Sequence, residues 1–256
     1  MPRSIFITGA SSGIGRATAI LFAEKGWYVG ITDINTAGLD ELKEAMPGKI
    51  GFAERLDVRD AEEVAAVLAA FARGAGGKID VLFNCAGILR INAFEDIPLS
   101  DHQAILDINA KGVLNCTYHA FPYLKAAGRA CVISMASVAS LFAAPSEVTY
   151  AASKFWVRGF TEALNMEWER HGIHVCDVMP NFVKTAMVEQ NPGRLIVNSG
   201  VAFTPDDVDR VVWKALGRRR IHWLIDRPIY KLSYGIARLM LPYSLVRSLL
   251  KKSAGF

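Results

Sequence analysis

Short apolar runs alternate with longer stretches of helical spacing along most of this 256-residue chain. Strands joined by helices pair in parallel, because a parallel connection needs a long crossover. The runs 79–83 and 173–179 are apolar almost throughout, which is typical of strands covered on both faces. The pattern therefore predicts an α/β fold, a single doubly wound domain over residues 1–226 with a seven-stranded parallel sheet. We expect strands at 4–8, 28–32, 50–55, 79–83, 130–134, 173–179 and 222–225, and helices at 14–26, 36–46, 60–73, 99–126, 148–171 and 205–217.

A glycine-rich turn follows the first predicted strand and leads into the first helix. Its sequence is Thr8-Gly9-Ala10-Ser11-Ser12-Gly13-Ile14-Gly15. Glycines there allow a tight turn, a close approach of the backbone to a pyrophosphate and close packing of helix on strand, and the free N–H groups at the helix start favour phosphate charge. The spacing departs from the general G-x-G-x-x-G fingerprint. Its place between the first strand and a helix nevertheless favours a dinucleotide site over a plain turn.

An acidic residue, Asp33, ends the second predicted strand. A carboxylate at this place hydrogen-bonds the adenosine ribose hydroxyls and repels a 2′-phosphate. Ser12, Ile34 and Asn35 supply no positive charge that would offset a phosphate. The sequence therefore favours NAD over NADP, with a plain turn-capping role of Asp33 as the alternative. Asp57 follows the third strand, where it either accepts from the adenine amino group or caps a turn.

Tyr150 and Lys154 stand one helical turn apart on one face of a predicted helix. A fixed ammonium, together with the positive nicotinamide ring of a bound cofactor, favours phenolate, and lowering a tyrosine pKa by ~3 needs ~4 kcal/mol. Tyr150 would then act as a general acid and base near neutral pH. By itself the pair indicates no more than an ordinary amphipathic helix, so its weight comes from its companions. Ser137, just past the fifth strand, could donate to a developing alkoxide, and Asn109, which is unfavourable within a helix, could hold a water.

Together these residues resemble the short-chain dehydrogenase/reductase family, in its simple subgroup of ~250 residues. The resemblance covers roughly residues 3–225 and rests on the glycine turn, Asp57, Asn84-Cys85-Ala86-Gly87, Asn109, Ser137, Tyr150-x-x-x-Lys154 and Pro180. It implies a Rossmann domain that binds NAD(P) at the carboxyl edge of its sheet. It also implies four catalytic roles: Tyr150 exchanges the proton with the substrate, Ser137 polarises the substrate oxygen, Lys154 bonds the nicotinamide ribose and lowers the Tyr150 pKa, and Asn109 holds a water of a proton relay.

The resemblance further implies a set of cofactor contacts. The stretch 84–87 would support the sheet and contact the adenine-side ribose, and Thr185 would bond the nicotinamide carboxamide. The cofactor residues predicted in this way are Gly9, Ser11, Ser12, Gly13, Ile14, Gly15, Asp33, Asp57, Val58, Asn84, Ala86, Gly87, Tyr150, Lys154, Pro180, Val183 and Thr185.

Three positions depart from the family pattern. Cys85 replaces a usual asparagine, and Asn181 replaces the usual glycine after Pro180. Asparagine tolerates positive φ, so the turn could persist, although the side chain could narrow the pocket. The C-terminus lacks the Val-Asp-Gly-Gly ending of relatives such as the acyl-carrier-protein reductases, which weakens a role in fatty-acid synthesis.

The predicted substrate loop lies between Thr185 and Thr204 and is mostly apolar, as are the pairs 88–89 and 141–142. Its candidate substrate residues, with those of the neighbouring loops, are Leu89, Leu141, Asn181 and Met187. We therefore expect the chain to interconvert a lipophilic secondary alcohol (steroid-, retinoid- or long-chain-like) and its ketone. The alternatives are an NADP-dependent carbonyl or 3-oxoacyl reductase, and a non-catalytic dinucleotide sensor on the same fold.

Positive charge is concentrated near the C-terminus. Residues 214–256 carry ten Lys or Arg and one acid, although the whole chain has a net charge of only +4. This distribution argues against nucleic-acid binding as the main function. Residues 227–256 are expected to form a basic amphipathic extension, in which 228–252 packs on protein or, as the alternative, lies on an anionic membrane surface. The family resemblance implies a homodimer or homotetramer that pairs helices 99–126 and 148–171.

The remaining features predict a reduced, metal-free protein. The four cysteines (Cys85, Cys116, Cys131 and Cys176) form no CxxC pair and sit in apolar surroundings, so we expect core thiols and no metal site. No run reaches the ~18 apolar residues of a membrane span. The first apolar stretch is too short for an export signal, which favours a cytoplasmic location, with membrane association as the alternative.

Overall fold

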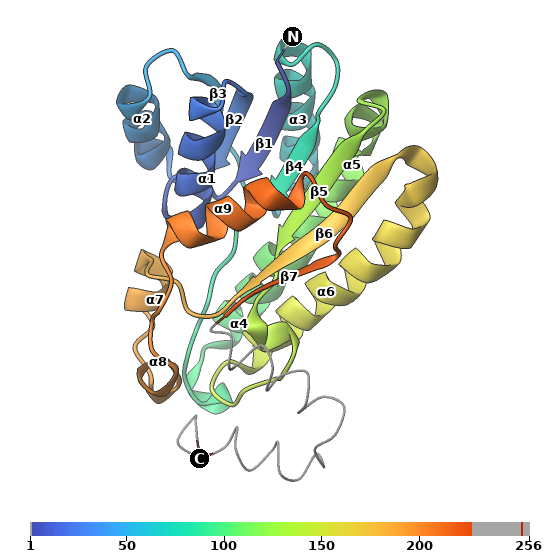
Figure 1. The fold of residues 1–256 in the computed structure, drawn as a ribbon. Helices are drawn as coiled ribbons and strands as arrows, with labels where there is room; N and C mark the ends of the chain where they lie inside the picture. The colour runs from blue at the N-terminus through green and yellow to red at the C-terminus, as the bar shows by residue number, and fades with distance from the viewer. Residues whose placement is uncertain (1, 227–251, 253–256) are drawn as a thin grey trace.

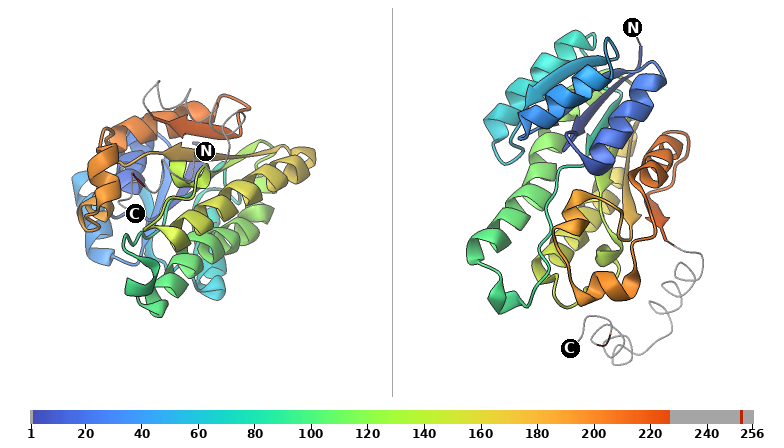
Figure 2. Two further views of the ribbon diagram at one scale, coloured as in Figure 1. Left: turned by 90° about the horizontal axis from the view of Figure 1, so that it is seen from below. Right: turned by 90° about the vertical axis from the view of Figure 1, so that its left-hand side faces the viewer.

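The computed structural model describes residues 2–226 and residue 252. Apart from residue 252, the predicted basic extension and its membrane contact lie outside the described residues. The described chain forms a seven-stranded parallel sheet with helices on both faces (Figures 1 and 2), so the predicted fold class is confirmed. The strands are β1 (Ser4–Thr8), β2 (Tyr28–Asp33), β3 (Ile50–Arg55), β4 (Val81–Asn84), β5 (Ala130–Met135), β6 (Ile173–Pro180) and β7 (His222–Ile225), in the sheet order β3-β2-β1-β4-β5-β6-β7.

Nine α-helices occur in the described residues: α1 (Gly13–Glu24), α2 (Thr36–Ala45), α3 (Ala61–Gly74), α4 (Leu99–Leu106), α5 (Gly112–Ala126), α6 (Val148–Trp168), α7 (Ala186–Glu189), α8 (Arg194–Ser199) and α9 (Pro205–Ala215). Short 3₁₀ turns lie at Phe94–Asp96, Val138–Ser140 and Glu169–His171. A π turn, Asp107–Lys111, separates α4 from α5, so the predicted helix 99–126 contains a change of hydrogen-bond register. The short helices α7 and α8 lie inside the predicted substrate loop and were not expected.

Two apolar layers hold the helices to the sheet. On one face, α1, α2 and α9 pack through side chains such as Phe22, Leu42 and Val212. On the other face, α3 and α5 pack through side chains such as Phe71 and Leu124. The sheet therefore has both faces buried, as the apolar strand sequences predict.

The fourth strand begins two residues later than predicted. The Asp80 carboxylate accepts hydrogen bonds from the backbone N–H of Ser4 at 2.8 Å and from its hydroxyl at 3.2 Å. This side chain takes the place of a strand pairing at the start of β1, and the ladder between β1 and β4 starts at Ile5 and Val81. The chain order reverses at this pair, because β1 lies between β2 and β4. Ligands of doubly wound sheets bind at such a switch point.

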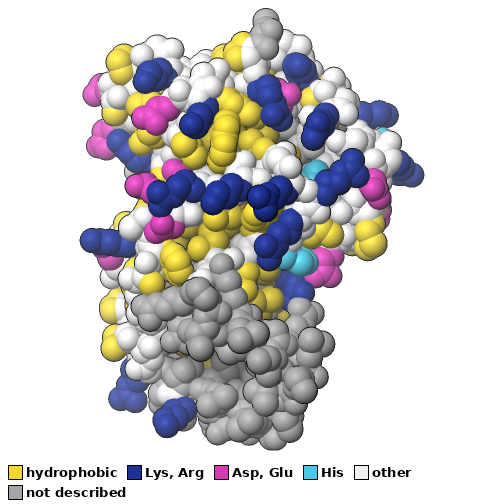
Figure 3. Space-filling view, in the orientation of Figure 1, with side chains coloured by type: hydrophobic (Ala, Val, Ile, Leu, Met, Phe, Trp, Pro, Cys, Tyr) yellow, Lys and Arg dark blue, Asp and Glu magenta, His cyan; other side chains and the backbone are white. Residues whose placement is uncertain are grey.

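Basic side chains are exposed on α9 and on the turn that follows it. Exposed Lys and Arg side chains form a row across one face of the molecule (Figure 3). Those of α9 and the turn after it are Arg210, Lys214, Arg218, Arg219 and Arg220. Within the described residues no helix is long and apolar enough to cross a membrane. No cluster of metal-ligating side chains occurs in this part of the chain either.

Candidate active site

A cavity of about 670 Å³ extends along the carboxyl edge of the sheet. Every residue predicted to bind the cofactor lines it except Asn84. Ser137, Tyr150 and Lys154 line it as well, together with Leu89, Asn181 and Met187 from the predicted substrate set. Leu141 does not line the cavity. It packs against an apolar cluster under α6, and its neighbour Phe142 lines the cavity instead.

The glycine turn has the geometry that a diphosphate needs. Gly9 has a φ of +69°, and a Cβ added there would lie 2.7 Å from the Ala86 Cα. A Cβ at Gly15 would overlap the Gly9 carbonyl oxygen. Ser12 precedes α1 without a side-chain capping bond, and the first turn of α1 contains no acidic residue. The N–H groups at the start of this helix therefore remain available to an anion, which fits a dinucleotide.

Asp33 holds the glycine turn and lines the cavity at the same time. One carboxylate oxygen accepts from the Ser11 N–H at 3.1 Å and from the Ser11 hydroxyl at 2.8 Å. The other accepts from the Asn35 N–H at 3.0 Å, which is a turn-capping contact. The alternative role considered for Asp33 is therefore present, and it does not remove the carboxylate from the cavity wall.

Asp57 is paired with a residue that the sequence analysis did not consider. Arg59 donates to both carboxylate oxygens of Asp57, with the shortest contact at 2.6 Å. This pairing lowers the pKa of Asp57 and keeps it ionised. The Arg59 N–H also bonds the carboxylate at 3.0 Å, so Asp57 does cap a turn. Both side chains line the cavity near Val58.

Asn84 supports the sheet behind the cavity. Its amide nitrogen donates to the Thr117 hydroxyl at 3.1 Å and the Ser134 hydroxyl at 3.2 Å. The next two N–H groups, of Cys85 and Ala86, bond the Thr8 hydroxyl and fix the end of β4 to the end of β1. Asn84 thus ties β4 to α5 and β5 and does not line the cavity, and the contact of the stretch 84–87 with the adenine-side ribose stays a prediction.

Tyr150, Lys154 and Ser137 meet at the middle of the cavity. The Lys154 ammonium lies 5.5 Å from the centre of the Tyr150 ring and donates to the Met135 carbonyl at 2.7 Å. Burial lowers the pKa of Lys154 to about 8. Ser137 caps the following 3₁₀ turn by accepting from the Ala139 N–H at 3.2 Å.

The lowering of the Tyr150 pKa was predicted from Lys154 together with the nicotinamide ring of a bound cofactor, and it stays a prediction for the cofactor-bound protein. Burial raises the pKa of Tyr150 well above its ordinary value, the neighbouring Glu147 raises it further, and a hydrogen bond with Ser137 lowers it only in part. The phenol is surrounded by apolar atoms and lies near the Glu147 carboxylate. The Lys154 ammonium donates its short hydrogen bond to the Met135 carbonyl and not to the phenol. In the free protein Tyr150 is therefore a protonated phenol.

Asn109 lies in the π turn and is fully buried. Its amide oxygen accepts from the Ile88 N–H at 2.8 Å, and its amide nitrogen donates to the Ile88 carbonyl at 2.9 Å and to the Ser153 hydroxyl at 3.2 Å. A Cβ added at Gly87 would sit 3.2 Å from the Asn109 side chain. Asn109 therefore fixes the cavity-lining segment after β4 to the helix that carries Lys154.

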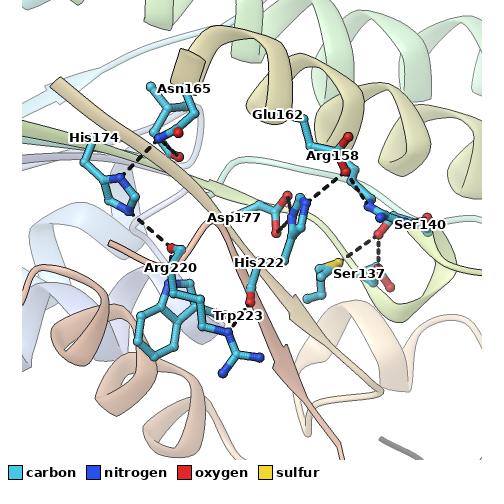
Figure 4. Close-up of polar contacts among 12 residues, drawn as sticks. Ser137, Ser140, Arg158, Glu162, Asn165, His174, Asp177, Arg220, His222 and Trp223 are labelled. Carbon is cyan, nitrogen blue, oxygen red and sulfur yellow. Dashed lines mark hydrogen bonds and ion pairs between the residues drawn. The ribbon is translucent and has the colours of Figure 1, made fainter. Parts of the chain in front are cut away.

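A polar network supports the Ser137 segment from behind (Figure 4). The Ser140 hydroxyl donates to the Ser137 carbonyl at 2.6 Å, and Arg158 reaches the Ser140 carbonyl at 3.4 Å. Arg158 pairs with Glu162 at 3.1 Å, and Glu162 lies 2.9 Å from a ring nitrogen of His222.

The network ends at a buried carboxylate. The other ring nitrogen of His222 lies 2.9 Å from Asp177, which is fully buried on β6. The hydrogen bond with Asp177 raises the pKa of His222, and burial raises the pKa of Asp177. The end of the sheet is thereby tied to the loop that presents Ser137.

The segment after β6 closes over one end of the cavity. Val183 and Phe203 form a parallel bridge, and the Lys184 N–H donates to the Phe203 carbonyl at 2.8 Å. Between these residues, α7 and α8 carry Met187 and Leu195, which line the cavity. This segment is the predicted substrate loop, closed on itself at its base.

Asn181 does not use the conformational freedom that the sequence analysis considered. Among the described non-glycine residues only Ser146 has a positive φ. The Asn181 side chain accepts from the Phe182 N–H at 2.8 Å and donates to the Asp226 carboxylate at 3.1 Å. It lines the cavity from this fixed position.

Glu147 is a cavity residue that the sequence analysis missed. It is 5% exposed and lies three residues before Tyr150. Burial raises the pKa of its carboxyl to about 8. Its position on the same helical face as Tyr150 was the available signal, but an acid at a helix start is ordinarily an exposed cap.

Comparison with known proteins gives a consistent result. Residues 3–194 match the short chain dehydrogenase family. A 3-oxoacyl-[acyl-carrier-protein] reductase of Thermotoga maritima is 36% identical over 189 residues, covering 73% of this chain and 76% of that protein. A cyclohexanol dehydrogenase of an Acinetobacter species is 31% identical over 188 residues, covering 72% and 74%. The crystal structure of a 3-ketoacyl-(acyl-carrier-protein) reductase from Brucella melitensis with NADH superposes with a TM-score of 0.80 at 26% identity, covering 88% and 96%.

Proposed function

This chain belongs to the short chain dehydrogenase family, and we propose that it interconverts a lipophilic secondary alcohol and its ketone with NAD as the cofactor. The observation that carries the proposal is the convergence of Ser137, Tyr150 and Lys154 on one cavity that also contains the glycine turn. A non-catalytic sensor would need the turn, but it would not need this set of polar groups. We therefore place the sensor second.

The chain's own residues have distinct tasks in this reaction. The cofactor, when bound, supplies the hydride acceptor or donor and, in its oxidised form, a positive ring. Tyr150 takes the hydroxyl proton of an alcohol, or returns a proton to a ketone. Ser137 donates to the same oxygen and holds it toward Tyr150. Lys154 holds positive charge beside the phenol. Asn109 fixes α6, which carries Tyr150 and Lys154, to the loop after β4.

The cavity wall supports a lipophilic substrate. Beside polar residues such as Ser137, Glu147, Tyr150, Lys154, Asn181 and Ser199, the cavity wall carries a set of apolar side chains: Ile88, Leu89, Val138, Phe142, Ala144, Met187, Val188 and Leu195. The relative named cyclohexanol dehydrogenase agrees with this class of substrate. An absorbance assay of NADH formation over cyclohexanol, long-chain secondary alcohols, steroids, retinol and polyols tests the proposal. We expect kcat/KM to be highest for apolar alcohols, and equal values for polyols would contradict it.

A 3-oxoacyl reductase is the second catalytic candidate. The names of the Thermotoga relative and the Brucella structure favour it. An NADPH-dependent reduction of a 3-oxoacyl thioester that exceeds every alcohol oxidation in kcat/KM would support this candidate over ours. Asp33 at the end of β2 opposes NADP as the cofactor of this candidate, since its carboxylate would face a 2′-phosphate, but it does not oppose an NADH-dependent 3-oxoacyl reductase.

The NAD preference can be tested by removing one charge. Asp33→Asn keeps an acceptor for Ser11 and loses the repulsion of a 2′-phosphate. Because juxtaposed like charges cost several kcal/mol, we expect the NAD-to-NADP ratio of kcat/KM to fall by ~100-fold, which corresponds to about 2.7 kcal/mol. Asp40→Asn, a change on the exposed side of α2, is the matched control and should leave the ratio unchanged. A wild-type protein that uses both cofactors equally would refute the assignment.

We also propose a homodimer or homotetramer that pairs the outer faces of α5 and α6. Large apolar side chains are exposed on these helices, with Tyr118 at 71% and Met166 at 70%. Leu114, Phe155 and Trp156 are exposed beside them. Such an apolar surface is typical of an interface. A monomeric mass in light scattering after gel filtration would exclude this proposal.

A further inference from the structure

The Glu147 carboxyl occupies an unusual position for an acid. Glu147 immediately precedes α6, where a side chain ordinarily accepts from the free N–H groups of the first turn. It makes no such capping bond. Among the described residues no hydrogen bond or ion pair to its side chain is present, although the residue is 5% exposed and lines the cavity. The fully buried side-chain atoms that lack a partner in the described part of the chain do not include the Glu147 oxygens, so the carboxyl is open to the cavity, and its partial removal from water is unfavourable for the charged form.

The backbone is strained at the residue before it. Ser146 has a φ of +72° and is the single described non-glycine residue in the left-handed region. The Asn92 N–H donates to the Ser146 carbonyl at 2.9 Å, which pins this turn to the loop after β4. A left-handed conformation costs a non-glycine residue about 1–3 kcal/mol, and such strain persists where the surrounding structure holds it. Here the strained turn precedes the inward-facing acid.

The residues around Glu147 determine which groups could donate a hydrogen bond to its carboxyl. Glu147 and Tyr150 lie one helical turn apart, and the charge of Glu147 influences the phenol. The other polar side chains among the residues that follow Ser134 in this lining are Ser137, Lys154, Asn181, Thr185 and Ser199, and none of them forms a hydrogen bond with Glu147 in the structure. Lys154 is engaged by the Met135 carbonyl. A ligand whose reacting oxygen lies at Tyr150 would reach the same part of the cavity wall, and a hydrogen-bond donor on that ligand would give the Glu147 carboxyl the partner that it lacks among the described residues.

We propose that Glu147 is a specificity-determining residue that accepts a hydrogen bond from a second polar group, a hydroxyl or an amine, near the reacting carbon of the substrate. The substrate is then a lipophilic diol or amino alcohol, or the corresponding hydroxy or amino ketone, and not a simple alcohol. This inference rests on the proposed function, because it takes the reacting oxygen to lie at Tyr150. It narrows the substrate class that the apolar wall alone would allow.

Matched substrates on one carbon frame provide the test. Cyclohexanol, trans-1,2-cyclohexanediol and trans-2-aminocyclohexanol are compared with the wild-type protein, Glu147→Gln, Glu147→Leu and the control Glu189→Gln. Glu189 is exposed on α7 and does not line this cavity. For the wild type and the control we expect kcat/KM to be at least ~10-fold higher for a substrate with the second donor, a factor that equals about 1.4 kcal/mol.

The variants separate the recognition of the second donor from an effect on folding. Glu147→Leu should lose the preference for a substrate with a second donor, and it should turn over cyclohexanol at least as well as the wild type. Glu147→Gln should keep part of the preference for the diol and lose that for the amine, because the amide still accepts a hydrogen bond but carries no charge. Equal kcat/KM for all three substrates in the wild type, or an unchanged preference in a folded Glu147→Leu, would overturn the proposal.

Calorimetric measurement of how tightly the three substrates bind to the NAD-loaded protein distinguishes a failure of the proposed activity from a failure of the proposed role of Glu147. Tighter binding of the diol or amino alcohol than of cyclohexanol, without any turnover, would remove the proposed activity and keep the role of Glu147. Turnover of cyclohexanol with no binding preference would keep the activity and remove that role.

Discussion

Tyr150→Phe is expected to reduce kcat/KM for alcohol oxidation by roughly 10²- to 10⁴-fold, the usual contribution of a positioned general acid and base. The ring would keep its packing beside Lys154, so the variant removes the ionisable oxygen and little else. Cofactor affinity should change little by comparison. Binding and turnover are measured separately, by titration of the cofactor and by absorbance.

Tyr118→Phe is the matched control, because Tyr118 does not line the cavity and the variant keeps the ring that the proposed α5 and α6 interface would use. It should retain wild-type kcat/KM. Since burial raises the pKa of Tyr150, the base form that oxidation requires increases with pH, and wild-type oxidation should accelerate toward alkaline pH while ketone reduction slows. A Tyr150→Phe variant that keeps both the rate and this pH dependence would show that another group moves the proton.

His222→Ala is expected to destabilise the fold by about 2–3 kcal/mol, since removal of one partner from a buried ion pair leaves the other charge uncompensated. Asp177 is fully buried and bonds His222 at 2.9 Å, while His222 is 27% exposed, so the effect should fall below that of a completely buried pair. Urea unfolding followed by circular dichroism measures the loss. The double variant His222→Ala with Asp177→Asn should recover part of it, because the buried charge is gone.

The pH dependence of this contribution has a defined sign. The folded-state pKa of His222 is raised above its ordinary value of 6.5, mainly by the Asp177 hydrogen bond. Its stabilisation is therefore fully present below about pH 6.5 and is lost as the pH rises through the folded-state pKa. The difference in unfolding free energy between wild type and His222→Ala should accordingly shrink at alkaline pH. A difference that grows with pH would contradict the assigned ion pair.

The fold was largely predictable because its signals are local and repeated. The alternation of apolar runs and helical spacing predicted all seven strands, and β1, β3 and β7 have the expected bounds. The glycine turn and the Tyr150 to Lys154 spacing located the cavity, since both depend on short segments of chain. The long helix was predicted as continuous, because a π turn conserves helical spacing on either side of Asn109.

Features that depend on packing between distant segments were not predictable in this way. Leu141 and Phe142 are equally apolar, and contacts with residues of α6 and β6 decide that only Phe142 faces the cavity. The sequence placed a lysine near Tyr150 but could not show that Lys154 would bond the Met135 carbonyl. Glu147 was missed for the same reason, since its burial results from a turn held against the loop after β4.

Because Val183 and Phe203 form a bridge, the segment between them could be exchanged as a unit for the corresponding segment of another protein. Its two ends meet before the chain re-enters the domain, so a replacement of similar length would need to match the fold at this junction, at Thr185 beside Gly13, and where Gly193 lies against Ile91. Ser137, Tyr150 and Lys154 are held by other segments and would keep their positions. Substrate range in this chain can therefore diverge, or be grafted from a relative, without rebuilding the proton-transfer apparatus.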